Sequence, residues 1–243
     1  MKILGIIPAR FASSRFPGKP LAMIGSHSMI ERVYRQAEKA NALSAVVVAT
    51  DDERILNHVH SFGGKPVMTS ARHASGTERC AEALQKSGEF DAVINIQGDE
   101  PFISPAQIDA VAAALNDESA EMVTIIRKAG DKNLLSNPNV VKVVINKKQQ
   151  ALYFSRSVIP FERNAGAENP AVHYVHTGIY GYTAKTLRAI VHLPPSPLEL
   201  TESLEQLRWL ENGFIIRTVL TDEENFPVDT PEDLEKLKST FGL

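Results

Sequence analysis

The sequence predicts an α/β fold in which helices cover both faces of a Rossmann-like, mixed but mostly parallel sheet. In the first half of the chain, short apolar runs alternate with segments of helical spacing, and this order implies right-handed crossovers between parallel strands. From about residue 122 extended segments follow one another and add strands. No Pro/Gly/Ser linker marks a boundary, so we expect a single domain over residues 1–243, with halves at about 1–120 and 121–243.

The elements of the first half are bounded by turn residues and by acidic helix starts. Short apolar runs predict strands at Ile3–Ile7, Ala45–Thr50, Pro66–Met68 and Ala92–Ile96. Helical spacing predicts helices at Ser28–Ala40, from Asp51-Asp52-Glu53 onward, and from the Ser75-Gly76-Thr77 turn through Leu84.

Extended segments dominate the second half and predict a smaller, substrate-facing subregion that continues the first sheet. They are Met122–Ile126, Val140–Ile145, Ala151–Phe154, Val172–Tyr182 and Phe214–Leu220. One helix is expected at Leu200–Leu210, and the run Asn164–Asn169 is a candidate for a flexible loop.

Composition limits the classes of protein to which the chain can belong. A net charge of −3 and an isoelectric point near 6.2 argue against general binding to nucleic acid or a membrane surface. The single cysteine, Cys80, excludes an internal disulfide, and no signal segment or bilayer-spanning apolar run is found. We therefore expect a soluble protein of a reducing compartment, most simply the cytoplasm. Six histidines lack a convincing metal-ligand spacing and are expected to be structural: His27, His58, His60, His73, His173 and His192.

A basic loop follows the first predicted strand. Residues 1–30 contain four Lys or Arg and no acidic residue, whereas the other 213 residues carry 22 basic against 29 acidic side chains. Three cations of this loop, the hydroxyls of Ser13 and Ser14 and the flexible Gly18 suit a polyphosphate, although a solvated basic loop remains an alternative. Neither a P-loop pattern nor a dinucleotide-binding Gly-x-Gly-x-x-Gly pattern is present.

Residues 8–21 read Pro-Ala-Arg-x-x-Ser-x-Arg-x-Pro-Gly-Lys-Pro-Leu, which resembles the signature of the sugar-acid cytidylyltransferases, and most closely the 3-deoxy-manno-octulosonate (Kdo) cytidylyltransferases, or CMP-Kdo synthetases. Five further blocks resemble that family in order: Ser75–Arg79, Asn95–Pro101, Ala151–Arg156, Leu204–Arg208 and Val228–Leu234. The resemblance therefore extends over most of the chain.

The resemblance implies a fold of the nucleotide-diphospho-sugar transferase type, with residues 1–120 as the nucleotide-binding half and 121–243 as the sugar-binding and dimerisation half. It implies transfer of CMP from CTP to the anomeric hydroxyl of Kdo, which releases diphosphate and serves lipopolysaccharide or capsule synthesis. It also implies Mg²⁺ as cofactor and a homodimer.

Two aspartates are the candidate metal ligands. Asp99 follows the fourth predicted strand, where a carboxylate can hold Mg²⁺ against phosphate oxygens, although a lone turn aspartate would more often bind its own backbone. Asp229 precedes a helix that Thr230 can cap with Pro231 at its first position. The resemblance pairs Asp99 with Asp229 on the metal, with one departure, since the family usually has Gly where this chain has Pro227-Val228.

The nucleotide site that the resemblance implies combines the basic loop, the Ser75 turn and the end of the fourth strand. Its expected residues are Pro8, Ala9, Arg10, Ser14, Arg15, Lys19, Ser75, Gly76, Thr77, Arg79, Gln97 and Gly98, of which Arg10 and Lys19 join Asp99 and Asp229 as catalytic residues. At the Ser75 turn, small residues leave room for a flat base, and capping of the helix by Ser75 or Thr77 is the alternative.

The acceptor site must bind an anionic sugar with many hydroxyls. Gln97, Arg156, His176, Tyr180, Glu202 and Gln206 are its expected residues. Arg156 can pair with the sugar carboxylate, while His176 with Tyr180 on a strand, and Glu202 with Gln206 on a helix, have spacings that share a face. Each residue alone would more often be a surface or core-edge residue.

Two rival functions remain open from the sequence. One is a cytidylyltransferase for another sugar acid, such as sialic acid or an amino-substituted Kdo. The other is a catalytically silent nucleotide-binding regulator on the same fold.

Overall fold

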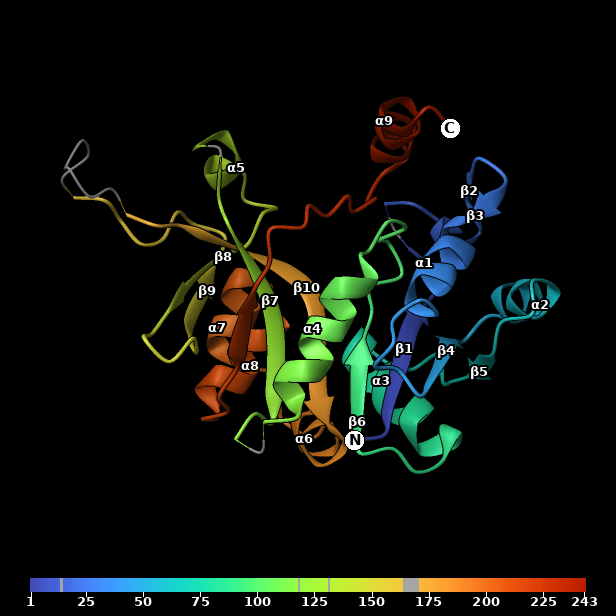
Figure 1. The fold of residues 1–243 in the computed structure, drawn as a ribbon, viewed down its shortest axis with the longest axis horizontal. Coiled ribbons are helices and arrows are strands. Elements are labelled where there is room, and N and C mark those ends of the chain that lie inside the picture. The colour runs from blue at the N-terminus through green and yellow to red at the C-terminus, as the bar shows by residue number, and fades with distance from the viewer. Residues whose placement is uncertain (14, 118, 131, 164–170) are drawn as a thin grey trace.

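The computed structural model describes residues 1–13, 15–117, 119–130, 132–163 and 171–243 (Figure 1). Its strands are β1 (Ile3–Ala9), β2 (Met23–Ile24), β3 (His27–Ser28), β4 (Ala45–Thr50), β5 (Pro66–Met68), β6 (Ala92–Asn95), β7 (Met122–Lys128), β8 (Lys142–Ile145), β9 (Ala151–Ser155), β10 (Tyr174–Thr183) and β11 (Arg217–Leu220). Its helices are α1 (Met29–Ala37), α2 (Glu53–Ser61), α3 (Gly76–Ser87), α4 (Pro105–Leu115), α5 (Lys132–Ser136), α6 (Ala184–Ile190), α7 (Pro197–Glu202), α8 (Glu205–Glu211) and α9 (Pro231–Phe241), with a 3₁₀ turn η1 at Lys19–Leu21.

The main sheet is mixed and mostly parallel, which confirms the predicted fold class. Its strand order is β11-β7-β10-β6-β1-β4-β5, and β8 and β9 extend it from β10. The first half supplies the parallel strands β6, β1, β4 and β5, whereas β10 runs antiparallel between β6 and β7. The second half is therefore built into the same sheet as the first.

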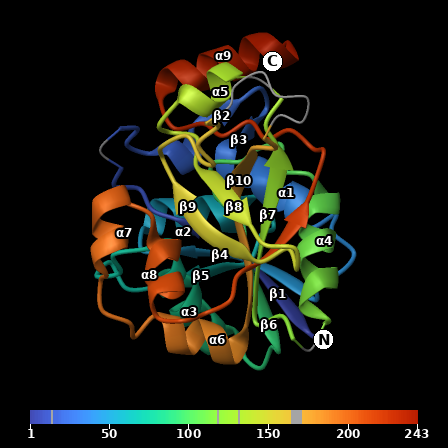
Figure 2. The same cartoon turned by 90° about the vertical axis from the view of Figure 1, so that its left-hand side faces the viewer.

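Helices cover both faces of the sheet (Figures 1 and 2). Successive side chains of a strand point to opposite faces, so in β1 Ile3 and Ile7 pack toward α1, α2 and α4, whereas Leu4 and Ile6 pack toward α3, α6 and α8. The central strand is apolar on both faces because it is buried on both, as expected for parallel strands. Among the described residues no helix is both long and apolar enough to cross a membrane.

The expected helix at Leu200–Leu210 is wrong as a single element. The chain forms α7 and α8 instead, because Ser203 takes a left-handed conformation at φ 52° and Leu204 is extended. A left-handed residue ends the hydrogen-bond ladder of a helix. The candidate loop Asn164–Asn169 lies outside the described residues.

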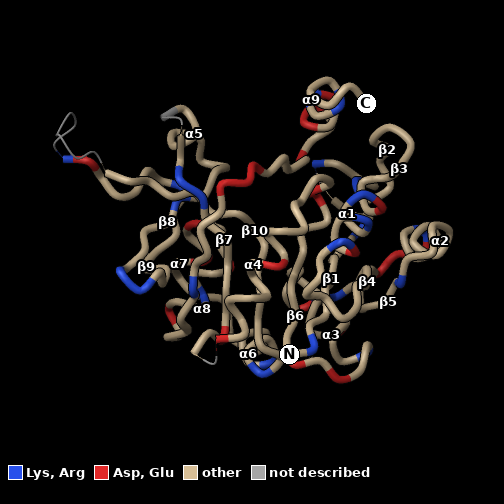
Figure 3. Tube along the Cα trace, viewed as in Figure 1, with Lys and Arg blue, Asp and Glu red and all other residues tan. Residues whose placement is uncertain are grey.

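A long connection, residues 221–230, leads from β11 across the top of the sheet to α9 (Figure 1), and acidic residues recur along it (Figure 3). At its end, α9 contributes Leu234 and Leu237 to a small apolar cluster with Ile24 and Met29 of the first half. The end of the chain therefore returns to the loop that follows β1.

Candidate active site

A cavity of about 260 Å³ lies where the parallel strands β1 and β6 end. Open α/β sheets bind ligands at the carboxyl ends of their strands, because loops from neighbouring strands meet there. The cavity is lined by Pro8, Ala9, Arg10, Ser13, Arg15, Lys19, Pro20, His73, Ala74, Ser75, Gly76, Arg79, Gln97, Gly98, Asp99 and Asp229.

Two acidic residues that are far apart in the sequence meet at one ammonium group. Lys19 Nζ donates a hydrogen bond of 2.8 Å to Asp99 Oδ2 and lies 3.5 Å from Asp229 Oδ1. It also donates to the carbonyl of Val228 at 3.0 Å, while Val228 N–H donates to the carbonyl of Asp99 at 3.0 Å. Arg15 Nη2 lies 3.2 Å from Asp229 Oδ1. The structure thus brings Asp99, Asp229 and two cations of the basic loop together.

The donor set at this point fits Mg²⁺. Two carboxylates, Asp99 and Asp229, converge on one cationic atom, and both supply the hard oxygen ligands that Mg²⁺ prefers. Within the described ranges no group of three or more His, Cys, Asp or Glu side chains could hold a metal. A Mg²⁺ ion here would complete its shell with waters and substrate phosphates, which is its usual mode of binding in nucleotide sites.

Two glycines, Gly76 and Gly98, allow their segments to approach Pro8 of β1 closely. A Cβ at Gly98 would lie 2.9 Å from the carbonyl oxygen of Pro8, and one at Gly76 would lie 3.3 Å from Pro8 Cγ. Ser75 caps α3 by accepting a hydrogen bond from Glu78 N–H at 3.2 Å, so the capping alternative is confirmed at this residue. Ser75 also lines the cavity, and capping does not exclude contact with a ligand.

Most residues expected at the nucleotide and metal sites line this one cavity. They are Pro8, Ala9, Arg10, Arg15, Lys19, Ser75, Gly76, Arg79, Gln97, Gly98, Asp99 and Asp229. Thr77 does not line it, because the side chain is buried and donates to Glu205 Oε2 at 2.7 Å. Arg79 borders the cavity, but its guanidinium bonds Thr69 Oγ1 and pairs with Asp51. Ser14 lies outside the described residues.

Of the residues expected to bind the acceptor, only Gln97 is among those that line this cavity. Gln97 lines the cavity and donates to the carbonyl of Gly178 in β10 at 2.8 Å. His176 and Tyr180 lie two positions before and after Gly178 in the same strand, with ring centroids 5.2 Å apart, and His176 Nε2 lies 2.9 Å from Thr124 Oγ1. Burial lowers the pKa of His176 to about 3, so the ring is neutral at pH 7.

Glu202, Gln206 and Arg156 do not reach the cavity. The break at Ser203 puts Glu202 and Gln206 on different helices, so the expected shared face is a wrong prediction for this pair. Glu202 accepts from Ser155 Oγ at 2.7 Å and from Arg156 N–H at 2.9 Å. Among the described residues, the Arg156 guanidinium donates to the carbonyls of Pro138, Glu202 and Ser203.

Two buried carboxyl groups lie behind the cavity residues. Glu100 follows Asp99, and its pKa is raised to about 7 by burial and by the Asp99 charge. Burial also raises the pKa of Glu205, which accepts the hydroxyl of Thr77 at the start of α3. Neither carboxyl was expected at the site from the sequence.

Sequence reasoning also missed cavity residues, above all His73, which was expected to be structural. Pro20 and Ala74 are the others, whereas Ser13, whose hydroxyl was expected to suit a polyphosphate, does line the cavity. His73 lies two positions before the Ser75 motif, and that proximity was the available signal. Its spacing from the other histidines does not indicate a metal site and therefore gives no signal for a functional role.

The chain is similar to known cytidylyltransferases. A family model described as cytidylyltransferase matches residues 4–225. The 3-deoxy-manno-octulosonate cytidylyltransferase of Bacteroides thetaiotaomicron is 53% identical, over 97% of this chain and 96% of that protein. The protein of the same name from Protochlamydia amoebophila is 44% identical, over 98% of this chain and 93% of that protein.

Solved structures agree with these relatives. The structure of CMP:2-keto-3-deoxy-manno-octonic acid synthetase complexed with CTP has a TM-score of 0.93 and 42% identity, and it covers 100% of this chain and 99% of that chain. A cytidylyltransferase from Leptospira borgpetersenii shares the fold, with a TM-score of 0.66 at 17% identity over 100% of this chain and 87% of that chain. The chain therefore belongs to the cytidylyltransferases, within the 3-deoxy-manno-octulosonate cytidylyltransferase family.

Proposed function

We propose that the chain transfers CMP from CTP to the anomeric hydroxyl of Kdo, giving CMP-Kdo and diphosphate. The observation that carries the proposal is the meeting of Asp99 and Asp229 at Lys19, in a cavity that Arg10 and Arg15 also line. The names of relatives at 44–53% identity, and the CTP held by the solved synthetase, supply the two substrates.

Arg10, Arg15 and Lys19 bind the triphosphate in this proposal, because cations at the cavity wall offset its charge. Asp99 and Asp229 hold Mg²⁺, which supplies charge stabilisation at the phosphoryl oxygens. Ser75, Gly76 and Gly98 line the wall against which the base and ribose pack in this proposal. The sugar hydroxyl attacks the α-phosphorus in line as diphosphate leaves, so catalysis comes from positioning and electrostatics and not from a covalent enzyme intermediate.

The acceptor binds on the side of the cavity that faces β10. Gln97 lines the cavity and donates a hydrogen bond to the carbonyl of Gly178 in this strand. His176 and Tyr180 lie in the same strand, two positions before and after Gly178. Arg156 is the candidate for the sugar carboxylate, because a guanidinium can donate to both carboxylate oxygens, and Glu202 and Gln206 are candidates for the sugar hydroxyls. These five residues lie outside the cavity lining, so in this proposal the acceptor extends beyond the cavity.

We further propose a homodimer in the cytoplasm that serves lipopolysaccharide or capsule synthesis. Support for a dimer comes from exposed apolar side chains on the second half, such as Leu152, Phe161 and Val172. Light scattering during gel filtration tests it, and a monomer at micromolar concentration would contradict it.

Diphosphate release from CTP tests the function, with Kdo, sialic acid and amino-substituted Kdo as separate acceptors and with or without Mg²⁺. The proposal expects release with Kdo that depends on Mg²⁺. Turnover of sialic acid with none of Kdo would favour the first rival. Absence of release with every acid, in a protein that binds CTP, would favour a silent regulator.

A further inference from the structure

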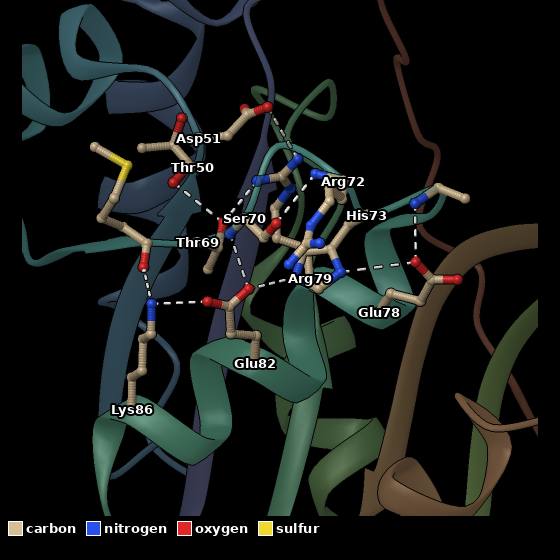
Figure 4. A network of polar contacts seen from close by, with 12 residues as sticks. Thr50, Asp51, Thr69, Ser70, Arg72, His73, Glu78, Arg79, Glu82 and Lys86 are labelled. Atoms are coloured by element: carbon tan, nitrogen blue, oxygen red, sulfur yellow. Dashed lines mark hydrogen bonds and ion pairs between the residues drawn. The ribbon is translucent and has the colours of Figure 1, made fainter.

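Side chains on one face of α3 bind the backbone of residues 68–74, the segment that precedes the cavity residues Ser75 and Gly76. Charged residues four positions apart, Glu78, Glu82 and Lys86, share that face and bind successive parts of residues 68–74 (Figure 4). Lys86 Nζ donates to the carbonyl of Met68 at 2.8 Å, Glu82 Oε2 accepts from Ser70 N–H at 2.8 Å, and Glu78 Oε2 accepts from Ala74 N–H at 2.8 Å.

Glu82 is the centre of this arrangement. Besides the Ser70 amide, its carboxylate binds the Nε2 atom of His73 and pairs with Lys86 Nζ at 2.7 Å. These charge-assisted contacts stabilise the ionised form, and they hold the pKa of Glu82 near 2, with the Lys86 hydrogen bond as the largest cause. The carboxylate therefore stays charged at any pH at which the enzyme would be assayed.

His73 depends on these carboxylates for its position. Its ring lies between Glu82, through Nε2, and Glu78, whose Oε2 is 3.7 Å from Nδ1. His73 borders both the active-site cavity and a second cavity of about 730 Å³ between α3 and α6.

We infer that Glu82 is a positioning residue for nucleotide binding, which holds His73 and the adjoining wall at Ala74, Ser75 and Gly76 in the shape that receives the nucleotide. The inference rests on the proposed function. His73 and Gly76 line the cavity on the α3 side, whereas Lys19, Asp99 and Asp229 come from other segments. Glu82 should therefore act on the binding of CTP and leave the chemical step unchanged.

Glu82→Gln tests this, because it preserves the shape of the side chain and removes its charge. We expect the Kd and the KM for CTP to rise about 10-fold, as for loss of a hydrogen bond to a charged group, while kcat changes less than twofold. Glu38→Gln is the matched control, because it makes the same change at a carboxylate that pairs with Arg35 outside the cavity. It leaves the Ser70 and His73 contacts of Glu82 intact, and it should leave both constants unchanged.

A double-mutant cycle shows whether Glu82 acts through His73. If it does, His73→Gln combined with Glu82→Gln should weaken CTP binding no more than His73→Gln alone. Additive losses, an unchanged Kd in Glu82→Gln, or an equal effect of Glu38→Gln would overturn the inference. Thermal unfolding of each variant accompanies the measurements, and a Kd that recovers at a lower temperature would assign the effect to stability and also overturn it.

Direct CTP binding, measured by calorimetry without acceptor, separates this inference from the proposed function. Wild-type protein that binds CTP but releases no diphosphate with Kdo contradicts the proposed function, and a weaker Glu82→Gln variant still supports the role of Glu82. Wild-type protein that binds no CTP overturns both.

Discussion

The ammonium of Lys19 donates a 2.8 Å hydrogen bond to the carboxylate of Asp99. The same nitrogen lies 3.5 Å from Asp229, so one cation lies between two carboxylates that are separated by more than half of the chain. This arrangement defines the place where opposite charges are concentrated in the cavity. The first two predictions follow from it.

Replacement of either carboxylate should abolish most activity. Asp99→Asn and Asp229→Asn each remove a hard oxygen ligand, so we expect kcat/KM for diphosphate release to fall by roughly 10²-fold or more. Stopped assays at several Mg²⁺ concentrations measure this, and the Mg²⁺ concentration required for half activity should rise. Asp109→Asn is the control, because that carboxylate binds the amides of Asn41 and Ala42 outside the cavity. Activity near the wild-type level in both site variants would contradict the metal assignment.

Removal of the Lys19 charge should impair both binding and chemistry. Lys19→Met takes away the cation that faces the two carboxylates and, in the proposed complex, the triphosphate. We expect a higher KM for CTP and a lower kcat, with a combined loss of roughly 10²-fold in kcat/KM. Lys39→Met removes an exposed cation of the same half, bonded to Gln36, and should leave both constants unchanged. A wild-type kcat in Lys19→Met would restrict this residue to ground-state binding.

A methyl group at Gly98 should distort the cavity floor. Its Cβ would lie 2.9 Å from the carbonyl oxygen of Pro8, and backbone on a central strand cannot move aside as a flexible side chain can. Gly98→Ala should therefore lower the free energy of unfolding by about 1–3 kcal/mol and weaken CTP binding. Denaturant melts and calorimetry measure these changes. Apart from its chain neighbours, a Cβ at Gly130 meets no atom of the described residues within 4 Å, so Gly130→Ala should change stability by less than about 0.5 kcal/mol. Equal effects of the two substitutions would contradict this account.

Acid should destabilise the fold through His176. Burial lowers its pKa in the folded chain to about 3, whereas an unfolded chain has the ordinary value of about 6.5. Between these values the unfolded chain binds a proton that the folded chain excludes, so the free energy of unfolding falls as the pH falls below 6.5. At pH 5 this contribution is about 2 kcal/mol.

His176→Gln provides the comparison for that prediction. It lacks the titrating ring, so its free energy of unfolding should decline less between pH 7.5 and pH 5 than that of the wild type, measured by urea melts. Equal declines would show that other groups cause the acid sensitivity. In the wild type the ring resonances of His176 should show no titration above pH 5.

The sequence by itself determined the family, the fold class and the edge of the sheet at which the site lies. Alternating apolar runs and helical segments are local patterns, and each strand that they predict in the first half is present in the structure. The motifs at residues 8–21, 75–79 and 95–101 follow or border those strands. Because parallel strands present their carboxyl ends at one edge, sequence order already implied that these motifs meet.

Only the tertiary structure decided which residues of the second half approach that edge. Asp229 reaches Lys19 because the connection 221–230 crosses the sheet and α9 packs on Ile24 and Met29. The left-handed Ser203 separates Glu202 from Gln206, although their spacing suits one helix. His73 lines the cavity and is bound by Glu82 of α3, a contact that the hydrophobic periodicity of the sequence does not predict. Periodicity reports which face of an element is buried, whereas these contacts depend on how distant segments pack, and packing is a property of the whole chain.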